Sequence, residues 1–435
     1  LRPGRVIETT LLGFVLLVID IIAGGWISSV PAIADVFTLN AKELVIALVI
    51  YSFAAAALPH WLLVTPRDYL STLMKIGTLV LLVLGILIAN PSVQMPALTE
   101  FASTSTGPTF AGDLFPFLFI TIACGALSGF HGAVSSGLTP KAVEKENQIR
   151  MIGYGSMLVE SFTAVIALIA AITISQGVYF STNMSASQIS TASGVTLTAT
   201  STPDERAEAA VKAVDSMKVS DIEGNQMKVT WDSVDENGNA KTYEGADALK
   251  QAASDIGENT IVSRTGGATT FAMGMANFLK SYLGGHDSMA FWYHFAIMFE
   301  AVFILTAVDA GTRVGRFFLQ EMIGKVIPKF GDKNWWPGIV VTSFLFTGAW
   351  GYLVYTGDIS SIWPLFGISN QLLASVTLLI GTTMLLRMNK TKYAWITAAP
   401  GIFMTFITFW AGIWLIMYQY IPTQKYLLAS LSVLV

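Results

Sequence analysis

The feature that most constrains this chain is a series of apolar runs, each about as long as a membrane-spanning helix. A helix needs about 20 mainly apolar residues to cross the hydrocarbon core of a bilayer. Hydrophobic residues make up 53% of the chain and charged residues only 12%. We therefore predict an all-α integral membrane protein with about nine transmembrane helices. The expected spans are Thr9–Val30, Lys42–Leu58, Leu70–Ala89, Asp113–Phe130, Ile152–Ser175, Met289–Ala310, Gly338–Tyr355, Pro364–Arg387 and Tyr393–Met417.

Basic residues in the short connections predict the orientation of these spans, because Lys and Arg concentrate on the cytoplasmic side of membrane helices. With nine spans, one side holds 15 of the 25 basic residues, whereas the other side, outside one long loop, holds only Lys42 and Lys425. We therefore expect the first residue to be cytoplasmic. The 15 residues are Arg2, Arg5, Arg67, Lys75, Lys141, Lys145, Arg150, Arg313, Arg316, Lys325, Lys329, Lys333, Arg387, Lys390 and Lys392.

The long loop, residues 181–285, has a different composition from the rest of the chain. It holds eight basic and 13 acidic residues, a net charge of −5, and it contains no expected span. The orientation above places it outside the cytoplasm. We therefore expect three regions: helices 1–5 over residues 1–180, an extracytoplasmic insert over 181–285, and helices 6–9 with the start of a further helix over 286–435.

Local signals predict a small α+β fold for the insert. Thr202, Pro203 and Glu205 form the pattern of a capping box with proline at the first helical position. The residues on both sides of Asn237-Gly238 alternate, which indicates a β-hairpin. A second helix is expected to end at Gly257. The insert either captures or gates a solute, or is a long loop that the fold tolerates.

Charge and reactive residues disfavour several functions. The net charge of −4 gives no indication of nucleic-acid binding. Cys124 is the single cysteine of the sequence, so no intrachain disulfide can form, and four scattered histidines do not suggest a metal site. We find no Ser/His/Asp set, metal-ligand spacing or phosphate loop in the sequence. We therefore expect neither an enzyme nor a bound cofactor.

Residues 124–140, "CGALSGFHGAVSSGLTP", break the pattern of an ordinary span. Glycines and polar side chains follow an apolar run at membrane depth, where irregular backbone survives only beside a cavity or inside protein. A broken helix exposes N–H groups with a positive dipole end, which suits a carboxylate. The alternative is close helix packing through Gly125-x-x-x-Gly129. The residues that we expect to contact a solute are Ser128, Gly129, His131, Ser135 and Ser136.

A second stretch of the same character is "IWPLFGISNQLLA", residues 362–374. Pro364 and Gly367 are expected to interrupt the start of this span. Ser369, Asn370 and Gln371 place three uncharged hydrogen-bonding groups just inside it, and we expect them to form the opposite wall of the site. The alternative is that Ser369 or Asn370 caps a helix.

Carboxyl groups also lie well inside three of the expected spans, where an ionisable side chain costs at least ~2.5–3.5 kcal/mol. Asp20, Glu160 and Glu300 are the candidates to carry a coupling proton, although each could equally form a hydrogen bond to another helix. Asp309 and Arg313 are spaced i, i+4 and are expected to form a structural ion pair.

Four stretches, in the same order, resemble the carbon starvation protein A (CstA) family of bacterial and archaeal membrane proteins. They are "SGFHGAVSSGLTPK" (Ser128–Lys141), "IGYGSMLVESFTAVIALIAA" (Ile152–Ala171), "FWYHFAIMFEAVFILTAVDAGTRVGRFFLQE" (Phe291–Glu321) and Ile362–Gln371. The resemblance implies a LeuT-like bundle of the amino acid–polyamine–organocation group in the plasma (inner) membrane. By this resemblance, the amino-terminal helices of the family, with a Gly/Pro-rich early segment, are expected to be missing before Leu1. If that segment lines the site, part of the site lies outside this chain.

The leading hypothesis is a secondary active transporter for a small carboxylate or peptide solute. The resemblance implies import of pyruvate or short peptides, driven by H⁺, when carbon is scarce. The alternative is a membrane nutrient sensor whose insert over 181–285 recognises the ligand.

Overall fold

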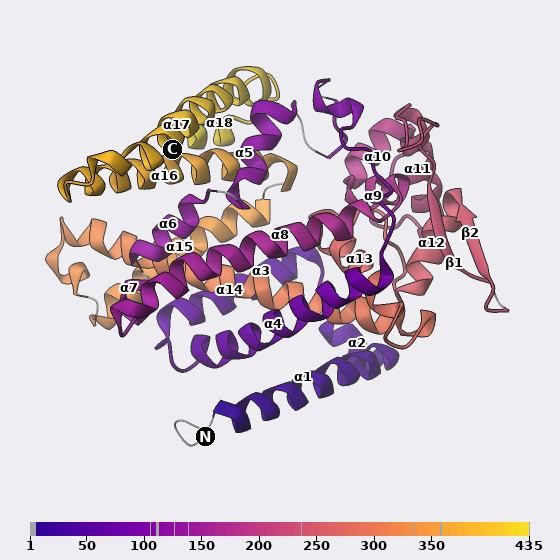
Figure 1. Cartoon of the computed structure of the whole chain (residues 1–435), viewed down its shortest axis with the longest axis horizontal. Helices are drawn as coiled ribbons and strands as arrows, with labels where there is room; N and C mark the ends of the chain where they lie inside the picture. Colours follow the sequence, from indigo (N-terminus) through magenta and orange to yellow (C-terminus); the bar gives the residue numbers. More distant parts are fainter. Residues whose placement is uncertain are drawn as a thin grey trace. The chain divides into compact units, whose positions relative to one another are not determined.

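A computed structural model of the chain describes residues 6–104, 106–109, 113–125, 127–137, 139–235, 237–332, 334–356 and 359–434 (Figure 1). Arg2, Arg5 and Lys333 of the expected basic set lie outside these residues. The described structure is mostly helical. Its elements are α1 (Val6–Ser29), α2 (Pro31–Phe37), α3 (Ala41–Ala57), α4 (Val64–Ala89), α5 (Phe119–Ile122), α6 (Gly129–Gly137), α7 (Thr139–Ala142), α8 (Ser156–Ile172), α9 (Gln176–Asn183), α10 (Ala186–Ser193), α11 (Pro203–Ser216), β1 (Thr230–Val234), β2 (Ala240–Glu244), α12 (Gly245–Asp255), α13 (Ala268–Lys280), α14 (Met289–Gly324), α15 (Trp336–Thr356), α16 (Ile359–Arg387), α17 (Trp395–Leu415) and α18 (Tyr426–Leu434).

Eight helical stretches among the described residues are long and apolar enough to cross a membrane. The ninth expected span, Lys42–Leu58, forms α3, which is not among these eight; its 17 residues are at the short end of the about 17–25 that cross a bilayer. The expected count of about nine therefore becomes eight by length and composition. The eight stretches are Glu8–Ile27, Val64–Ala89, Leu114–Gly137, Glu146–Ile172, His286–Gly324, Trp336–Thr356, Leu365–Arg387 and Trp395–Tyr420.

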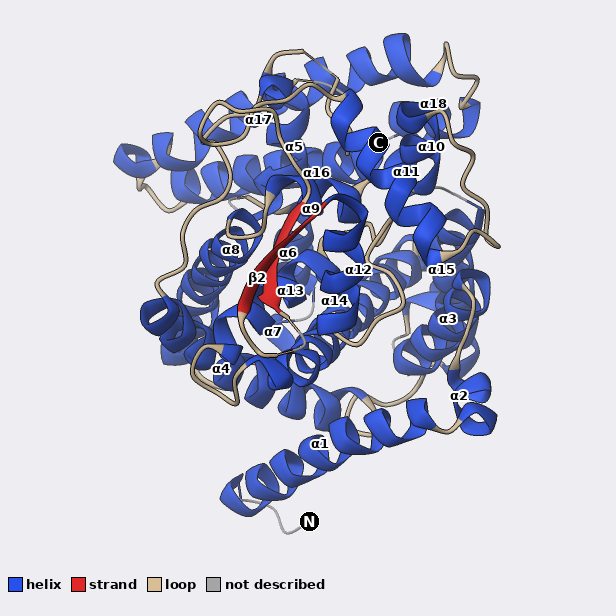
Figure 2. Cartoon of the chain, turned by 90° about the vertical axis from the view of Figure 1, so that its right-hand side faces the viewer, coloured by secondary structure: helices blue, strands red, loops and turns tan. Residues whose placement is uncertain are grey.

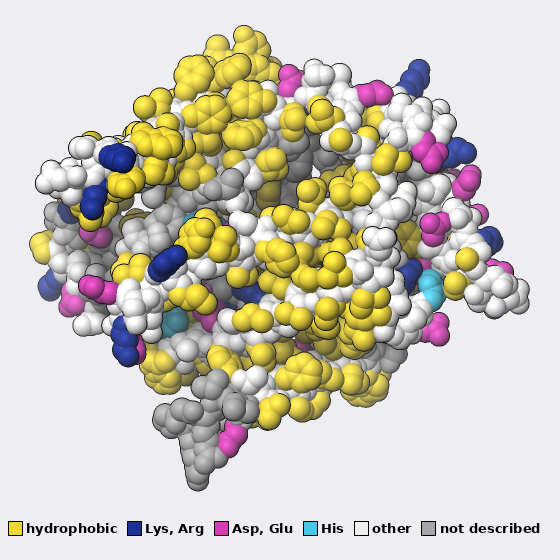
Figure 3. All heavy atoms as spheres, viewed as in Figure 1, with side chains coloured by type: hydrophobic (Ala, Val, Ile, Leu, Met, Phe, Trp, Pro, Cys, Tyr) yellow, Lys and Arg dark blue, Asp and Glu magenta, His cyan; other side chains and the backbone are white. Residues whose placement is uncertain are grey.

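The outer faces of these helices carry large apolar side chains. Leu168 of α8 is 60% exposed, and Phe406 of α17 is 69% exposed. Figure 3 shows hydrophobic side chains covering broad areas of the visible surface. Contiguous apolar surface of this extent is unfavourable in water and marks a membrane or protein contact. Together with the eight apolar helices, it identifies a multi-pass membrane protein.

Contacts between residues divide the chain into two compact units. Unit 1 comprises Leu1–Gly25, Leu70–Ala111 and Phe162–Ile304, and unit 2 comprises Trp26–Tyr69, Gly112–Ser161 and Leu305–Val435. Unit 1 contains the acidic insert with the spanning segments that pack against it. Unit 2 contains α3, α15, α16 and α17 and the glycine-rich stretch over 124–140.

The insert has the expected α+β elements. Thr202 Oγ1 accepts from Glu205 N, and the Glu205 side chain accepts from Thr202 N, so the predicted capping box begins α11. Strands β1 and β2 pair antiparallel on the two sides of Gly238, which has φ = +80° (Figure 2). The helix expected to end at Gly257 is α12, and Gly257 adopts the left-handed conformation, with φ = +72°. All three local predictions are confirmed.

The core of unit 1 joins the insert to the spanning segments. Phe278 and Leu279 of α13 are fully buried, as is Leu82 of α4. A Cβ on Gly274 of α13 would approach the Ala170 Cβ of α8 to 2.8 Å, so the two backbones lie very close. Sequence reading missed α9, α10 and α13. Ser175 and Ser185 cap α9 and α10, and these caps were a usable signal, but each of these two helices has only eight residues, too few for a clear helical period.

Unit 2 is built around α16, which packs against α5, α6, α17 and α18. Figure 1 shows α16 and α17 side by side. The interruption that we expected at the start of this span is wrong, since α16 runs unbroken from Ile359 to Arg387. Pro364 lies in the second turn, so its missing N–H removes only one hydrogen bond near the helix start. Gly367 instead serves packing, because its Cβ position lies 3.4 Å from the Ile120 Cγ2 of α5.

Candidate functional site

The span over Leu114–Gly137 leaves the α-helical conformation in its middle. A short turn of 3₁₀-helix follows α5 at Ala123–Gly125, and residues 127 and 128 are not helical. The chain then re-enters a helix at Gly129, the start of α6. The break predicted from the glycines of this stretch is confirmed.

Two side chains hold the new helix start. Ser128 Oγ accepts from the N–H of His131 at 3.3 Å, which is the bond of an N-cap serine. Asn370 Oδ1, from the middle of α16, accepts from the N–H of Phe130 at 2.8 Å and from Ser128 Oγ at 3.3 Å. The N–H groups expected to face a solute carboxylate are therefore bound by the protein at these two positions. Asn370 acts as a cap for a different helix from its own.

The break lies directly against α16. An added Cβ on Gly129 would lie 2.5 Å from Leu373 Cβ and 2.6 Å from Ala374 N, closer than real Cβ contacts come. One turn later, a Cβ on Gly132 would lie 2.5 Å from Thr377 Oγ1. Gly129 and Gly132 therefore serve close packing in this structure, the alternative that the glycine spacing also allowed.

Buried amide groups on α16 lack partners beside the break. Asn370 is 5% exposed and Gln371 is fully buried. Neither Asn370 Nδ2 nor the two amide atoms of Gln371 has a hydrogen-bond partner in the described part of the chain. Leaving a buried polar group unpaired costs about 1–3 kcal/mol, so such groups call for a bound water, ion or solute. Ser369, the third predicted residue, donates to the Leu365 carbonyl at 2.9 Å.

His131 and Glu160, predicted for different roles, form a pair. His131 Nε2 of α6 lies 3.2 Å from Glu160 Oε2 of α8, and the two side chains are 54% and 41% exposed. An imidazole beside a carboxylate can take up and release a proton near neutral pH. Nothing in the local sequence indicates this contact, because 29 positions separate the two residues.

Ser135 and Ser136 make only local hydrogen bonds. Ser135 Oγ donates to the Gly132 carbonyl at 3.0 Å, and Ser136 Oγ donates to the Ala133 carbonyl at 3.2 Å. Both side chains are exposed. Their hydroxyl oxygens keep free lone pairs that a solute could use.

The other two predicted proton carriers have different surroundings. Asp20 is exposed on α1, and Glu300 is partly buried on α14. Within the described residues, neither carboxyl group has a hydrogen bond or an ion pair. Glu160 is therefore the candidate carboxylate that has a titratable partner.

A buried charge cluster in unit 2 was only partly predicted. Asp309 Oδ2 lies 2.5 Å from Arg67 Nη1 and accepts from the Tyr51 hydroxyl at 3.0 Å. The expected ion pair with Arg313 is wrong, since the Arg313 guanidinium instead donates to the carbonyls of Ala55 and, at 3.1 Å, Leu58. These carbonyls end α3 and lack partners within their own helix, so they compete for Arg313. The sequence predicted that Asp309 forms an ion pair, but it did not predict that the partner is Arg67.

The same face of α14 continues with two more buried polar residues. Arg316 and Gln320 follow Arg313 at helical spacing and are 4% and 2% exposed. Arg316 lies over the Phe317 ring at 4.4 Å, but its Nε and Nη1 atoms have no hydrogen-bond partner among the described residues. Both amide atoms of Gln320 are also unpartnered there. In the described residues we find no group of three or more His, Cys, Asp or Glu side chains that could hold a metal ion.

Comparisons with known proteins agree on one family. A family model described as carbon starvation protein CstA matches residues 1–230 and 217–411. The chain is 44% identical to the peptide transporter CstA of Campylobacter jejuni, over 96% of this chain and 55% of that protein. It is 46% identical to the peptide transporter CstA of Escherichia coli, over 95% of this chain and 55% of that protein.

A relative with a different name matches equally well. The pyruvate/proton symporter BtsT of Escherichia coli is 43% identical, over 94% of this chain and 56% of that protein. The chain thus spans about half the length of the curated relatives that it matches. No protein of solved structure matches it. These matches show that the chain belongs to the carbon starvation protein CstA family.

Proposed function

We propose that this protein is a secondary active transporter that imports pyruvate or short peptides together with protons across a bacterial or archaeal plasma membrane, with its first residue in the cytoplasm. The observation that carries this proposal is the His131–Glu160 pair, which joins α8 to the helix start at the broken span. The names of the relatives support both the solutes and the coupling ion.

The proposed solute site surrounds the break. Ser128, His131, Ser135 and Ser136 form one side, and Ser369, Asn370 and Gln371 of α16 form the other. Gly129 allows the two backbones to pack closely beside the site. The unpartnered amides of Asn370 and Gln371 support this assignment, because a solute carboxylate or peptide group would satisfy them. A helix broken at membrane depth is a feature of LeuT-like carriers, and we extend the proposal to that bundle.

The proposed coupling group is Glu160. A carboxylate beside His131 binds its proton with an affinity that depends on the state of the imidazole and on access to each side of the membrane. Protonation of Glu160 breaks its ion pair with His131, and the His131 side chain is then free to contact the solute. Glu300 and Asp20 are the second and third candidates for the proton carrier. They rank below Glu160 because, among the described residues, neither has a titratable partner at the proposed solute site.

Replacing Glu160 with glutamine is expected to abolish proton-driven accumulation while keeping solute exchange. With one proton per solute, a gradient of one pH unit corresponds to about 1.4 kcal/mol and supports about tenfold accumulation. The purified protein in liposomes should reach this ratio with pyruvate or dialanine, and Glu160→Gln should reach a ratio of about one. Counterflow of labelled solute, which moves no net proton, should persist in this variant.

Glu300→Gln and Asp20→Asn are the matched comparisons, since each removes one carboxylate charge from a spanning helix. Both should retain accumulation. If Glu160→Gln accumulates solute normally, Glu160 does not carry the proton. Loss of accumulation in Glu300→Gln alone would transfer the role to Glu300. Absence of uptake and counterflow for every solute in the unmodified protein would refute transport itself.

A further inference from the structure

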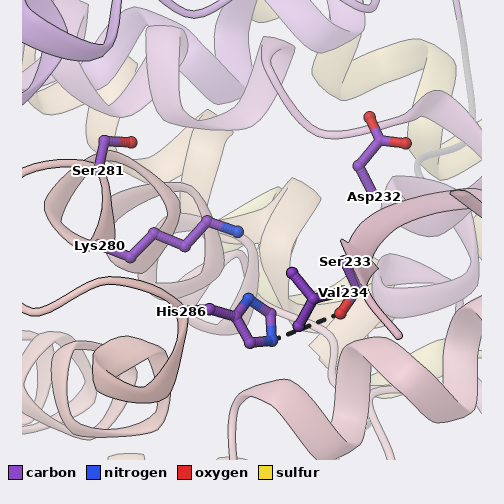
Figure 4. Close-up of a pocket in the computed structure, with 6 residues that line it drawn as sticks. All are labelled: Asp232, Ser233, Val234, Lys280, Ser281 and His286. Atoms are coloured by element: carbon purple, nitrogen blue, oxygen red, sulfur yellow. Dashed lines mark hydrogen bonds between the residues drawn. The ribbon is translucent and has the colours of Figure 1, made fainter. Parts of the chain in front are cut away.

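The insert carries an open pocket in unit 1, whereas the broken span belongs to unit 2. It has a volume of about 340 Å³ and is lined by Asp232, Ser233, Val234, Lys280, Ser281 and His286. Figure 4 shows Lys280 and His286 on one side of this pocket and Asp232 on the other. A volume of this size lies at the lower end of the range for small-molecule sites, about 300–1,000 Å³.

The ammonium of Lys280 lines the pocket, and no carboxylate of the described residues lies within ion-pair distance of it. Its described hydrogen-bond neighbour is the thioether Met289 Sδ at 3.8 Å, a weak acceptor. Lys280 forms no salt bridge with any residue that the structure describes. Burial lowers the pKa of Lys280, while the carboxylates of Asp255 and Asp232 partly oppose this lowering. A partly buried ammonium without an anion gains from a carboxylate ligand.

The carboxylate of Asp232 provides the opposite charge. It is exposed on β1, where Oδ1 accepts from Thr242 Oγ1 at 2.6 Å. The second oxygen keeps its capacity to accept from a ligand. Asp232 and Lys280 also line an adjoining hollow of about 130 Å³, whose other walls include Asn277 and Gln94. The Asp232 carboxylate and the Lys280 ammonium therefore lie where the pocket and the adjoining hollow meet.

The histidine of the pocket is fixed by buried groups. His286 Nε2 lies 3.2 Å from Asp255 Oδ1, and Asp255 also accepts from Trp231 Nε1 at 2.8 Å. Ser233 Oγ approaches the same His286 nitrogen at 3.4 Å. A catalytic triad requires the serine and the aspartate on opposite ring nitrogens, so this arrangement orients the ring rather than activating Ser233.

We propose that this pocket binds a small zwitterion, the chemistry shared by amino acids and short peptides, with the ligand carboxylate at Lys280 and its ammonium at Asp232. Ser281 and His286 line the carboxylate side of the pocket. The site goes beyond the proposed transport function, because it recognises the solute at the insert rather than at the broken span and requires no proton movement. Pyruvate lacks the ammonium and therefore binds here more weakly than dialanine.

The test measures binding of dialanine to the purified protein in detergent by calorimetry, and compares it with dialanine amide and N-acetyl-dialanine. Each modified ligand lacks one of the two charges and leaves the protein unchanged, so folding cannot explain a difference. Each should bind at least about tenfold more weakly, which is the loss of one charge-assisted hydrogen bond. Equal affinity for all three ligands would overturn the proposal.

Protein variants locate the two contacts. Lys280→Gln should weaken dialanine binding and abolish the preference for the free carboxylate. Asp232→Asn should abolish the preference for the free ammonium. Lys228→Gln is the matched control, because Lys228 is an exposed lysine of the insert that lies 4.0 Å from Glu244 and outside both hollows. An effect of Lys228→Gln equal to that of Lys280→Gln would refute the assignment.

The same measurement in Glu160→Gln separates this site from the transport proposal. Binding at the insert should persist in that variant with unchanged ligand preferences. If binding disappears together with counterflow, the zwitterion binds along the transport path and not in the insert. If transport fails in the unmodified protein but the ligand preferences persist, the insert site stands alone.

Discussion

Replacing Asp309 with asparagine is expected to destabilise the protein strongly. The Asp309 side chain is 1% exposed and pairs with Arg67 at 2.5 Å. Asparagine keeps the size of the side chain and can still accept from Tyr51, but it leaves the guanidinium of Arg67 without its buried counter-charge. Removing one partner of a buried ion pair typically costs about 3–5 kcal/mol. The midpoint of thermal unfolding in detergent, followed by tryptophan fluorescence, should fall markedly.

The matched control removes the other carboxylate of the same arginine. Asp68 Oδ1 lies 2.6 Å from Arg67 Nη2, but its side chain is 37% exposed. An exposed pair contributes about 0–1 kcal/mol, so Asp68→Asn should shift the midpoint little. Adding Arg67→Met to Asp309→Asn removes the unpaired charge and should recover most of the lost stability. Equal shifts for Asp309→Asn and Asp68→Asn would contradict this view of the cluster.

Replacing Gly129 with alanine is expected to separate the broken span from α16. The added Cβ would lie 2.5 Å from Leu373 Cβ and 2.6 Å from the Ala374 backbone nitrogen, which cannot rotate away. Forcing an extra carbon into such a contact typically costs about 1–3 kcal/mol. The shift would also weaken the bond from Phe130 N to Asn370, which holds the helix start. Both the unfolding midpoint and the transport rate should therefore fall.

Gly125→Ala provides the comparison, because a Cβ at Gly125 meets nothing within 4 Å. Both variants add one methyl group to the same interrupted span, four residues apart. Gly125→Ala should leave the unfolding midpoint and uptake close to those of the unmodified protein. If Gly125→Ala is the more damaging variant, the contact with α16 does not govern the stability of the break.

The predictions for Asp309 and for Glu160 concern two different kinds of polar group in the expected spans. Asp309 and Arg67 form a buried ion pair with each other, so the loss of either should reduce stability before it affects solute recognition. Glu160, with both its own side chain and that of His131 partly exposed, can change protonation without unfolding the protein. A variant that loses proton coupling while keeping its unfolding midpoint would therefore distinguish the two roles.

The sequence by itself determined the features that depend on neighbouring residues. Apolar runs marked the spans because a helix in lipid must satisfy its own backbone and cover its length with apolar side chains. Thr202 with Glu205, Asn237-Gly238 and Gly257 predicted a helix start, a hairpin and a helix end, because caps and turns use atoms only a few residues apart. The glycines of 124–140 predicted the break in their span for the same reason.

Only the tertiary structure decided which polar groups meet. Asn370 caps a helix 240 positions away in the chain, and Asp309 pairs with Arg67 rather than with Arg313. Which partner a buried polar side chain pairs with depends on the free energy of burying both groups together. That free energy depends on how whole helices pack. Pro364 and Gly367 resemble a break in sequence, yet α16 stays continuous, because Pro364 lies near its beginning and Gly367 packs against α5 within an unbroken helix.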